Sequence, residues 1–101
     1  MGYITTVRAR LRDPDPAAAM AQHNEIVDRL RPRGTPLGGV GHAVYANAQD
    51  PNEFLAVDRW ESLEGLQQFM GDPSVQGEIG SLFEGPPDVT VWAEREGWRS
   101  Y

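Results

Sequence analysis

The chain has 101 residues, of which 40% are hydrophobic, and a formal net charge of -6. This length supports one hydrophobic core and is too short for two folded units, so we expect a single domain over residues 1–101. The negative charge repels nucleic acids and anionic membranes, and we expect neither as a partner. No apolar stretch approaches the ~20 residues that span a bilayer. The first residues lack a signal-peptide pattern and cysteine is absent, so the predicted location is the cytoplasm.

Residue types also exclude several kinds of chemistry. All nine basic residues are arginines, and without lysine there is no Schiff-base nucleophile. Without cysteine there is neither a thiolate nucleophile nor a thiolate metal site. The two histidines are too few for a catalytic zinc site, which usually has three protein ligands, unless a carboxylate such as Asp58 joins them. We therefore predict no metal. The GxSxG and HExxH motifs of hydrolases are missing as well.

The first half of the chain predicts a strand, a helix and a loop. Residues 3–12 alternate between two faces and predict a strand. Asp15 followed by a proline is a favourable start for a helix over residues 17–31. The expected apolar stripe of that helix contains Met20, His23, Asn24, Val27 and Leu30. Residues 32–41 contain four glycines and two prolines and predict a mobile loop.

The second half predicts a hairpin, two helices and a last strand. A strand over 42–49 and a strand over 53–60 are joined by a turn at 50–52. Phe54, Ala56, Asp58 and Trp60 alternate with Leu55, Val57 and Arg59, so neither side of this strand is plainly solvent-exposed. Helical spacing follows over 63–70, capped by Ser62, and again over 75–83. Residues 89–96 alternate as the fourth strand.

This order of elements is the split βαβ plan, an α+β ferredoxin-like fold with a four-stranded antiparallel sheet. In that plan the first strand lies between the third and the fourth. Arg8 and Arg10 are then expected across from Asp58 and from Glu94 or Glu96, with Trp60 and Trp92 beside these charges. We expect another subunit to cover a sheet face that carries both aromatic and charged side chains, so we predict a homodimer.

Two sets of side chains are candidates for a site. His23 and His42 are the first candidates for a catalytic base, because their unperturbed pKa values are near neutrality. Trp60, Trp92, Tyr45 and Asn47 are candidates to bind an aromatic ligand. Asn24 lies beside His23 and is a further candidate for substrate binding. Each of these residues also fits a structural role, in the core, at an interface or as a hydrogen-bonded side chain.

The strand pattern also predicts where a pocket lies. We expect His42, Val44 and Ala46 beside Leu55, Val57 and Arg59, on the face that the helices cover. A cleft is then expected between the first helix and the sheet, with the glycine-rich segment at its mouth and His23 or His42 inside. A register slip of one residue would exchange His42 for Tyr45 and Asn47 on the cleft side.

The chain resembles a known family at this point. The strand ending in DRWES (58–62), the amphipathic helix with Phe69, the DPSV motif (72–75), the short helix, the proline-rich turn and the last strand resemble the antibiotic biosynthesis monooxygenase domain. That family belongs to the dimeric α/β barrel superfamily. The resemblance implies a cofactor-free monooxygenase acting on a quinol or an aromatic polyketide-like molecule. The alternative is a non-catalytic ligand-binding or accessory dimer. No histidine occurs within residues 75–83, which disfavours haem degradation.

Overall fold

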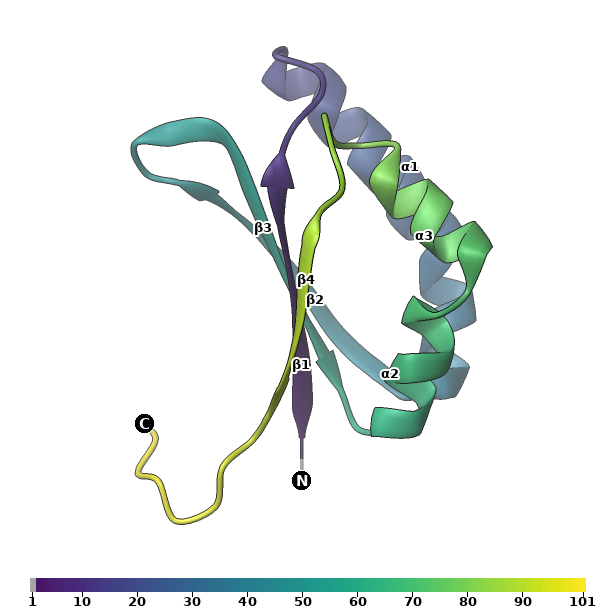
Figure 1. Ribbon diagram of the computed structural model, residues 1–101, viewed down its shortest axis with the longest axis vertical. Helices are drawn as coiled ribbons and strands as arrows, with labels where there is room; N and C mark the ends of the chain where they lie inside the picture. Colours follow the sequence, from purple (N-terminus) through teal and green to yellow (C-terminus); the bar gives the residue numbers. More distant parts are fainter. Residues whose placement is uncertain (1) are drawn as a thin grey trace.

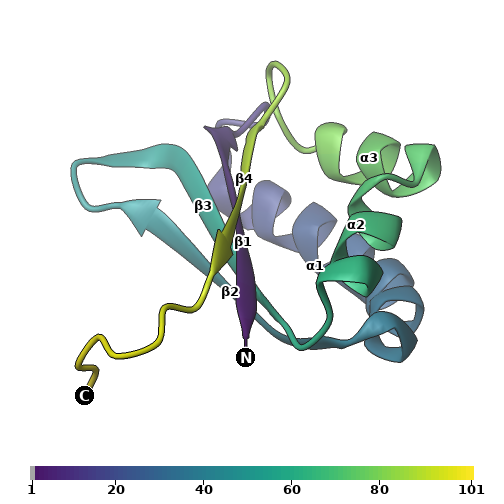
Figure 2. The ribbon, with the colours of Figure 1, turned by 60° about the horizontal axis from the view of Figure 1, so that its bottom comes forward.

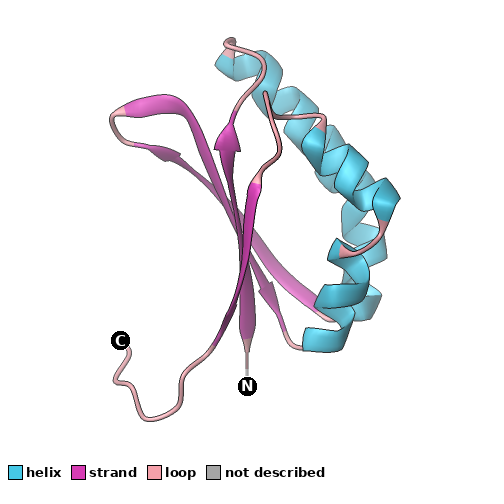
Figure 3. Ribbon diagram, viewed as in Figure 1, coloured by secondary structure: helices cyan, strands magenta, loops and turns pink. Residues whose placement is uncertain are grey.

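The computed structural model describes residues 2–101 and has two layers, a twisted sheet and a set of helices on one of its faces (Figure 1). The elements are β1 (Tyr3–Arg10), α1 (Pro16–Gly34), the short 3-10 helix η1 (Thr35–Leu37), β2 (Gly39–Asn47), β3 (Asp50–Trp60), α2 (Leu63–Met70), α3 (Pro73–Gly80) and β4 (Asp88–Ala93). Figure 3 shows the same two layers by secondary structure. None of the helices in the described part of the chain combines the length and the apolar character that crossing a membrane requires.

The four strands form one antiparallel sheet in the order β2-β3-β1-β4. α1 connects β1 to one edge strand, β2, and the helices α2 and α3 connect β3 to the other edge strand, β4. This is the βαββαβ plan, so the predicted ferredoxin-like α+β fold and the predicted strand order are confirmed. β4 ends at Ala93, and the remaining residues leave the sheet as an extended tail (Figure 2).

Side chains at the helix starts explain where the helices begin. Asp15 caps α1 by accepting a hydrogen bond from the Ala17 amide. Ser62 accepts from the Gly65 amide at the start of α2, and Asp72 caps α3. The core lies between the helices and the sheet. It is formed by Val7, Ile26, Leu30, Phe54, Ala56, Val75, Leu82 and Phe83.

The predicted loop at residues 32–41 is wrong, because most of this segment is regular. α1 continues through Pro32 to Gly34, and η1 and β2 follow almost at once. Within the segment only Gly38 has the left-handed backbone that glycine favours, with φ 104°. Gly34 instead permits close packing, since a Cβ there would lie 3.3 Å from the Phe69 ring. Gly38 therefore serves a change of backbone direction, and Gly34 serves close packing between α1 and α2.

The predicted apolar stripe of α1 is wrong at its N-terminal end, whereas His23, Val27 and Leu30 of that stripe do line the space between α1 and the sheet. Ala19, Ile26 and Leu30 are buried, whereas Met20 is 61% exposed. Both stripes have helical spacing, and the sequence alone does not decide between adjacent stripes. The small side chain of Ala19 lets the first turns of α1 lie close to the body of the protein.

The hairpin between β2 and β3 turns earlier than predicted. Its turn is formed by Ala48 and Gln49, and Asp50, which we expected in the turn, already pairs with Asn47. The Asn47 side chain accepts a hydrogen bond of 2.9 Å from the Gln49 amide and so stabilises the turn.

An irregularity next to this turn decides which side chains of β2 face the helices. A regular antiparallel ladder that started from the pair Asn47 and Asp50 would place the even-numbered residues of β2 opposite the odd-numbered residues of β3. The register shifts between Ala46 and Asn47, and beyond the shift even-numbered residues pair with even-numbered ones. His42 consequently pairs with Asp58. The predicted placement of His42 beside the odd-numbered residues of β3 is wrong.

The face of β3 that carries Asp58 and Trp60 points toward the helices, and our prediction that it faces a second subunit is wrong. Trp60 is 5% exposed, and its ring packs on Phe69 with centroids 5.3 Å apart. The reason is the register between β1 and β3, which pairs Val7 with Ala56 and so places the even-numbered residues of β3 on the same face as Val7, over the core.

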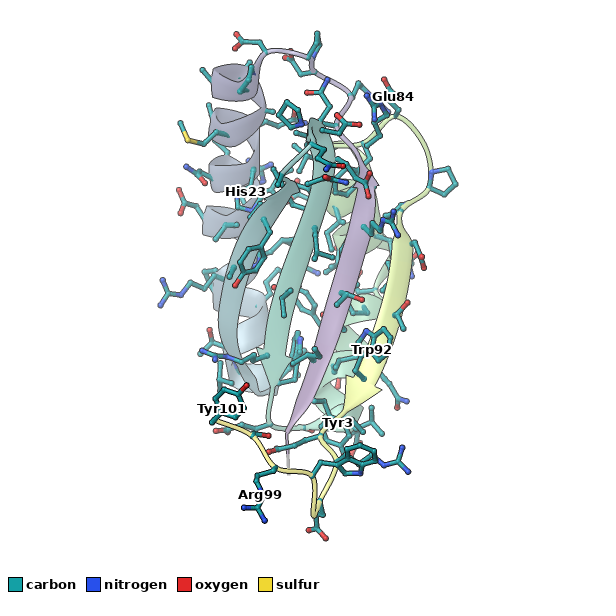
Figure 4. The ribbon with its side chains drawn as sticks, turned by 90° about the vertical axis from the view of Figure 1, so that its left-hand side faces the viewer. Tyr3, His23, Glu84, Trp92, Arg99 and Tyr101 are labelled. Carbon is teal, nitrogen blue, oxygen red and sulfur yellow. The ribbon has the colours of Figure 1, made fainter. Side chains whose placement is uncertain are left out.

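The arginines of β1 also have other partners than predicted. Arg8 forms an ion pair of 2.7 Å with Glu53, and Arg10 forms one of 2.7 Å with Asp50. The hydrogen bond from Arg10 holds the pKa of the Asp50 carboxyl below its usual range. Neither arginine is paired with Asp58. Trp92 lies on the side of the sheet away from the helices, which we call the open face (Figure 4), and Arg8 and Glu53 border the same hollow as Trp92.

Candidate functional site

A cleft of about 660 Å³ lies between α1 and the helix-facing side of the sheet. The predicted position of the cleft is therefore confirmed. Its volume is within the range of roughly 300–1,000 Å³ that is usual for small-molecule sites. Residues 39–41, the start of β2, contribute to its lining. Apolar walls come from Val7, Ile26, Val27, Leu30, Phe54, Ala56, Phe69, Ile79, Leu82 and Phe83.

Two histidines from different elements meet in the lining of this cleft. His23 comes from α1 and His42 from β2, and their Nε2 atoms are 2.9 Å apart. The ring planes differ by 18°, and the ring centroids are 5.1 Å apart. The distance between the ring centroids exceeds the distance between the Nε2 atoms by about the sum of the two distances from ring centre to nitrogen. The two nitrogens therefore lie between the ring centres, and the rings meet edge to edge and are not stacked. Figure 4 shows His23 on α1 beside the edge of the sheet.

Oxygen acceptors hold the outer nitrogen of each ring. His42 Nδ1 is 2.5 Å from Asp58 Oδ1, and His23 Nδ1 is 3.0 Å from Asn24 Oδ1. The second oxygen of Asp58 accepts a hydrogen bond of 3.4 Å from the Thr5 hydroxyl. The result is a continuous chain of five side chains that crosses three strands and ends on α1.

Strand register is what builds the sheet half of this chain. Thr5 pairs with Asp58 across β1 and β3, and Asp58 pairs with His42 across β3 and β2. Neighbours across antiparallel strands have their Cβ atoms about 4.5–5.5 Å apart, close enough for their side chains to contact each other. Thr5 is fully buried, and the His42 and Asp58 side chains are 34% and 24% exposed.

The hydrogen bonds also determine where protons are needed. A neutral imidazole that donates from Nδ1 has only a lone pair at Nε2. If both histidines donate from Nδ1, their Nε2 contact requires one extra proton between the rings. If the Asn24 amide is turned so that its nitrogen donates to His23, the contact forms with two neutral rings. In both arrangements the Nε2 atoms are engaged with each other, and a ligand must separate the rings to reach either one.

The structure brings only some of the predicted site residues together. His23, His42 and Asn24 are joined, whereas Trp60 is buried beside the cleft without lining it. The Nε1 donor of Trp60 is buried and has no partner within residues 2–101. The remaining candidates lie on the open face, where they border a separate hollow: Tyr45, Asn47 and Trp92. The predicted aromatic wall is therefore divided between two sides of the sheet and does not form.

The sequence named Asp58 only as a carboxylate that would have to join the histidines at a metal, and the predicted register placed it on the opposite face from His42. A usable signal was present, since a carboxylate in the middle of an otherwise apolar set of alternating residues needs a polar partner. Of the residues that the structure describes, the basic side chains that line the cleft are the two histidines and Arg31, and Asp58 contacts one of the histidines. Within residues 2–101 no group of three or more metal-binding side chains is arranged to hold a metal ion. Asp58 contacts the outer nitrogen of His42 and is not a third ligand beside the two Nε2 atoms.

No protein-family model matches the chain, and no curated protein sequence is similar to it. Solved structures do share its fold. SnoaB, a cofactor-independent oxygenase from Streptomyces nogalater, is 12% identical, with a TM-score of 0.67 and 98% of each chain covered. Rv0793 from Mycobacterium tuberculosis is 20% identical, with a TM-score of 0.64 over 95% of this chain and 97% of its own.

A structure described as an antibiotic biosynthesis monooxygenase is 10% identical, with a TM-score of 0.67 over 94% of this chain and 99% of its own. The chain therefore has the ferredoxin-like fold of antibiotic biosynthesis monooxygenase structures. The match extends over nearly the whole chain, so the helices and strands around the cleft are included in it.

Proposed function

We propose that the protein is a cofactor-independent monooxygenase of the antibiotic biosynthesis type, acting on a quinol or an aromatic polyketide-like molecule in the cleft beneath α1. The observation that carries this proposal is the pair His23 and His42, which lies in the wall of an apolar cleft and is held in place by Asp58. The same overall fold in SnoaB, a cofactor-independent oxygenase, supports it. We further propose that the protein works as a cytoplasmic homodimer.

The reaction requires only a few groups from the protein. The aromatic hydroxyl loses its proton to an imidazole, and the resulting anion is electron-rich enough to transfer an electron to molecular oxygen. The two radicals combine at carbon as a peroxide, which loses water to leave a carbonyl group. Overall, a CH₂ group and O₂ become C=O and H₂O, with no other reductant. Apolar side chains such as Ile26, Phe54 and Phe83 line the cleft, and such walls disfavour the water that would intercept the radical pair.

An oxygen electrode tests the proposal directly. A panel of hydroquinones and anthrones is offered to the protein, and we expect oxygen uptake above the enzyme-free rate with at least one of them. His42→Gln should reduce that uptake by about 100-fold or more, the usual loss for a removed base. Met20→Gln, an exposed change on α1, is the matched control and should leave uptake unchanged. Enzyme-free rates across the whole panel would exclude the oxygenase.

One feature favours a second candidate function, that of a non-catalytic ligand-binding or accessory dimer. Because the Nε2 atoms of His23 and His42 bind each other, neither is free as a base in this arrangement. A binding protein needs no free base. Tight binding of an aromatic ligand in the cleft, with no oxygen uptake, would support this alternative.

A further inference from the structure

The carboxylate of Asp58 has a hydrogen-bond partner at each of its two oxygens. One of its oxygens faces His42 Nδ1 at 2.5 Å, and the other accepts from the hydroxyl of Thr5, a residue with no exposed surface. All three residues stand opposite one another on adjacent strands. The sheet itself therefore fixes the His42 ring, with Nδ1 toward the carboxylate and Nε2 toward the cleft.

His23 is held in a weaker way. Its Nδ1 faces the side-chain oxygen of Asn24, which is the next residue of α1 and is exposed. A positive charge formed on His42 faces a carboxylate, whereas one formed on His23 faces only the dipole of an amide. Hydrogen bonds with a charged partner are roughly twice as strong as neutral ones. The two histidines are thus chemically unequal even though their rings touch.

We propose that His42 Nε2 is the base of the site, that Asp58 is its positioning residue, and that His23 covers the base until a ligand separates the rings. This inference rests on the proposed function for its substrate. In the step, the O–H bond of an aromatic hydroxyl breaks and an N–H bond forms at His42 Nε2. The electron pair stays on the ligand oxygen, and Asp58 stabilises the imidazolium, as a carboxylate does in a catalytic triad. His23 exchanges its contact with His42 for solvent or for the ligand.

Nitrogen NMR of the histidine rings tests the positioning role without any ligand. We expect the proton of neutral His42 on Nδ1, because that atom faces the carboxylate. In Asp58→Asn this preference should be lost, whereas Asp58→Glu should retain it in part. Asp28→Asn, a change on the exposed side of α1, is the matched control. A His42 proton on Nε2 in the unaltered protein would overturn the assignment.

The ionisation of a bound dye then tests which histidine is the base. 2-Hydroxyanthraquinone changes its visible absorption when its hydroxyl loses a proton, so the bound spectrum reports proton transfer in the absence of oxygen chemistry. We expect the anion band with the unaltered protein and with His23→Gln, and we expect its loss with His42→Gln and a reduction of about 10-fold or more with Asp58→Asn. Loss of the band in His23→Gln together with its retention in Asp58→Asn would overturn the inference, as would its absence from the unaltered protein.

The two proposals fail in different ways. If the dye is ionised by His42 but no quinol or anthrone supports oxygen uptake, the base assignment holds and the oxygenase is excluded. If oxygen uptake occurs and Asp58→Asn lowers it no more than Asp28→Asn does, the oxygenase holds and the positioning role is excluded. Where uptake is measurable, the pH profile of Asp58→Asn should differ from that of the unaltered protein, because the variant has lost the charge next to its base.

Discussion

Gly65 marks the place where α2 and η1 approach each other most closely. A Cβ on this residue would lie 1.7 Å from the carbonyl oxygen of Leu37, which no side-chain rotation relieves. Gly77, on the exposed side of α3, has open space around the same position. Gly65 is therefore required by close packing, whereas the surroundings of Gly77, in the neighbouring helix, do not require a glycine.

Alanine at these two positions should therefore act in opposite directions. We expect Gly65→Ala to destabilise the protein by about 3 kcal/mol or to prevent folding, because the backbone of η1 must move. Gly77→Ala should stabilise it by about 0.5–1 kcal/mol, since alanine loses less conformational entropy in a helix. Urea unfolding of the two variants measures both effects. Equal stabilities would contradict the close contact.

Residue type alone identified the histidines of the site, but not their partner. His23 and His42 stood out because no other side chain of the chain titrates near neutrality without help from its surroundings. Asp58 was named only as a carboxylate that would have to join them at a metal. Its role depends on the pairing between strands, and the residue type does not indicate that pairing.

Among the elements, α3 has a charged cap and α2 a neutral one. The Ser74 amide and hydroxyl, followed by Arg33, hold the pKa of the Asp72 carboxyl below its usual range. Ser62 serves as the cap of α2 with a hydroxyl that carries no charge. The contribution of the two caps should therefore depend differently on pH.

The stabilisation from Asp72 should be complete above the ordinary carboxyl pKa of about 4 and should disappear as the pH falls through the lower value of the folded state. Asp72→Asn, which keeps an acceptor and loses the charge, should lower the melting temperature at pH 7 and flatten its decline toward pH 3. Ser62→Ala should lower the melting temperature similarly at both pH values, because its cap is neutral. Parallel curves for Asp72→Asn and the unaltered protein would argue against a charged cap.

The elements themselves were predictable, whereas the register was not. Alternation and helical spacing predicted the four strands and the three α-helices, because these patterns repeat over many residues. η1 and the first residues of β2 lie in the segment that was predicted as a loop. The register predicted for the hairpin was wrong because of a local irregularity between Ala46 and Asn47, which exchanges the two faces of β2 relative to β3. Neither residue is a glycine or carries another mark of a bulge. The contents of the cleft depended on that irregularity, and for this reason the fold was easier to predict than the site.

At the scale of the whole molecule, the described helices lie on one side of the sheet and leave its open face uncovered (Figure 1). Tyr45 is 55% exposed and Trp92 52% exposed, and they lie among the ion pairs of β1 and β3. The Trp92 Nε1 donor already binds Thr6, so the exposed part of this side chain is its apolar ring. A face of this kind is suited to contact with a second copy of the chain.

We expect sedimentation at micromolar concentration to give a species of twice the 11.2 kDa chain mass. A double change, Tyr45→Glu with Trp92→Glu, should shift it to the monomer, because burying two unpaired carboxylates is unfavourable. Met20→Glu adds a charge on the far side of α1 and should leave the dimer intact. A monomer from the unaltered protein would remove the dimer from the proposal.

The three tryptophans are distributed so that each can report on a different part of the molecule. Trp60 is 5% exposed in the core, Trp92 is 52% exposed on the open face, and Trp98 is 69% exposed on the tail, with Arg95 over its ring. Single-tryptophan versions should therefore differ in emission colour and in quenching by acrylamide. Trp60 emission should shift to the red only when the protein unfolds, and Trp92 should become less accessible to acrylamide when two chains associate. Tryptophan fluorescence can then follow folding and association separately in the same protein.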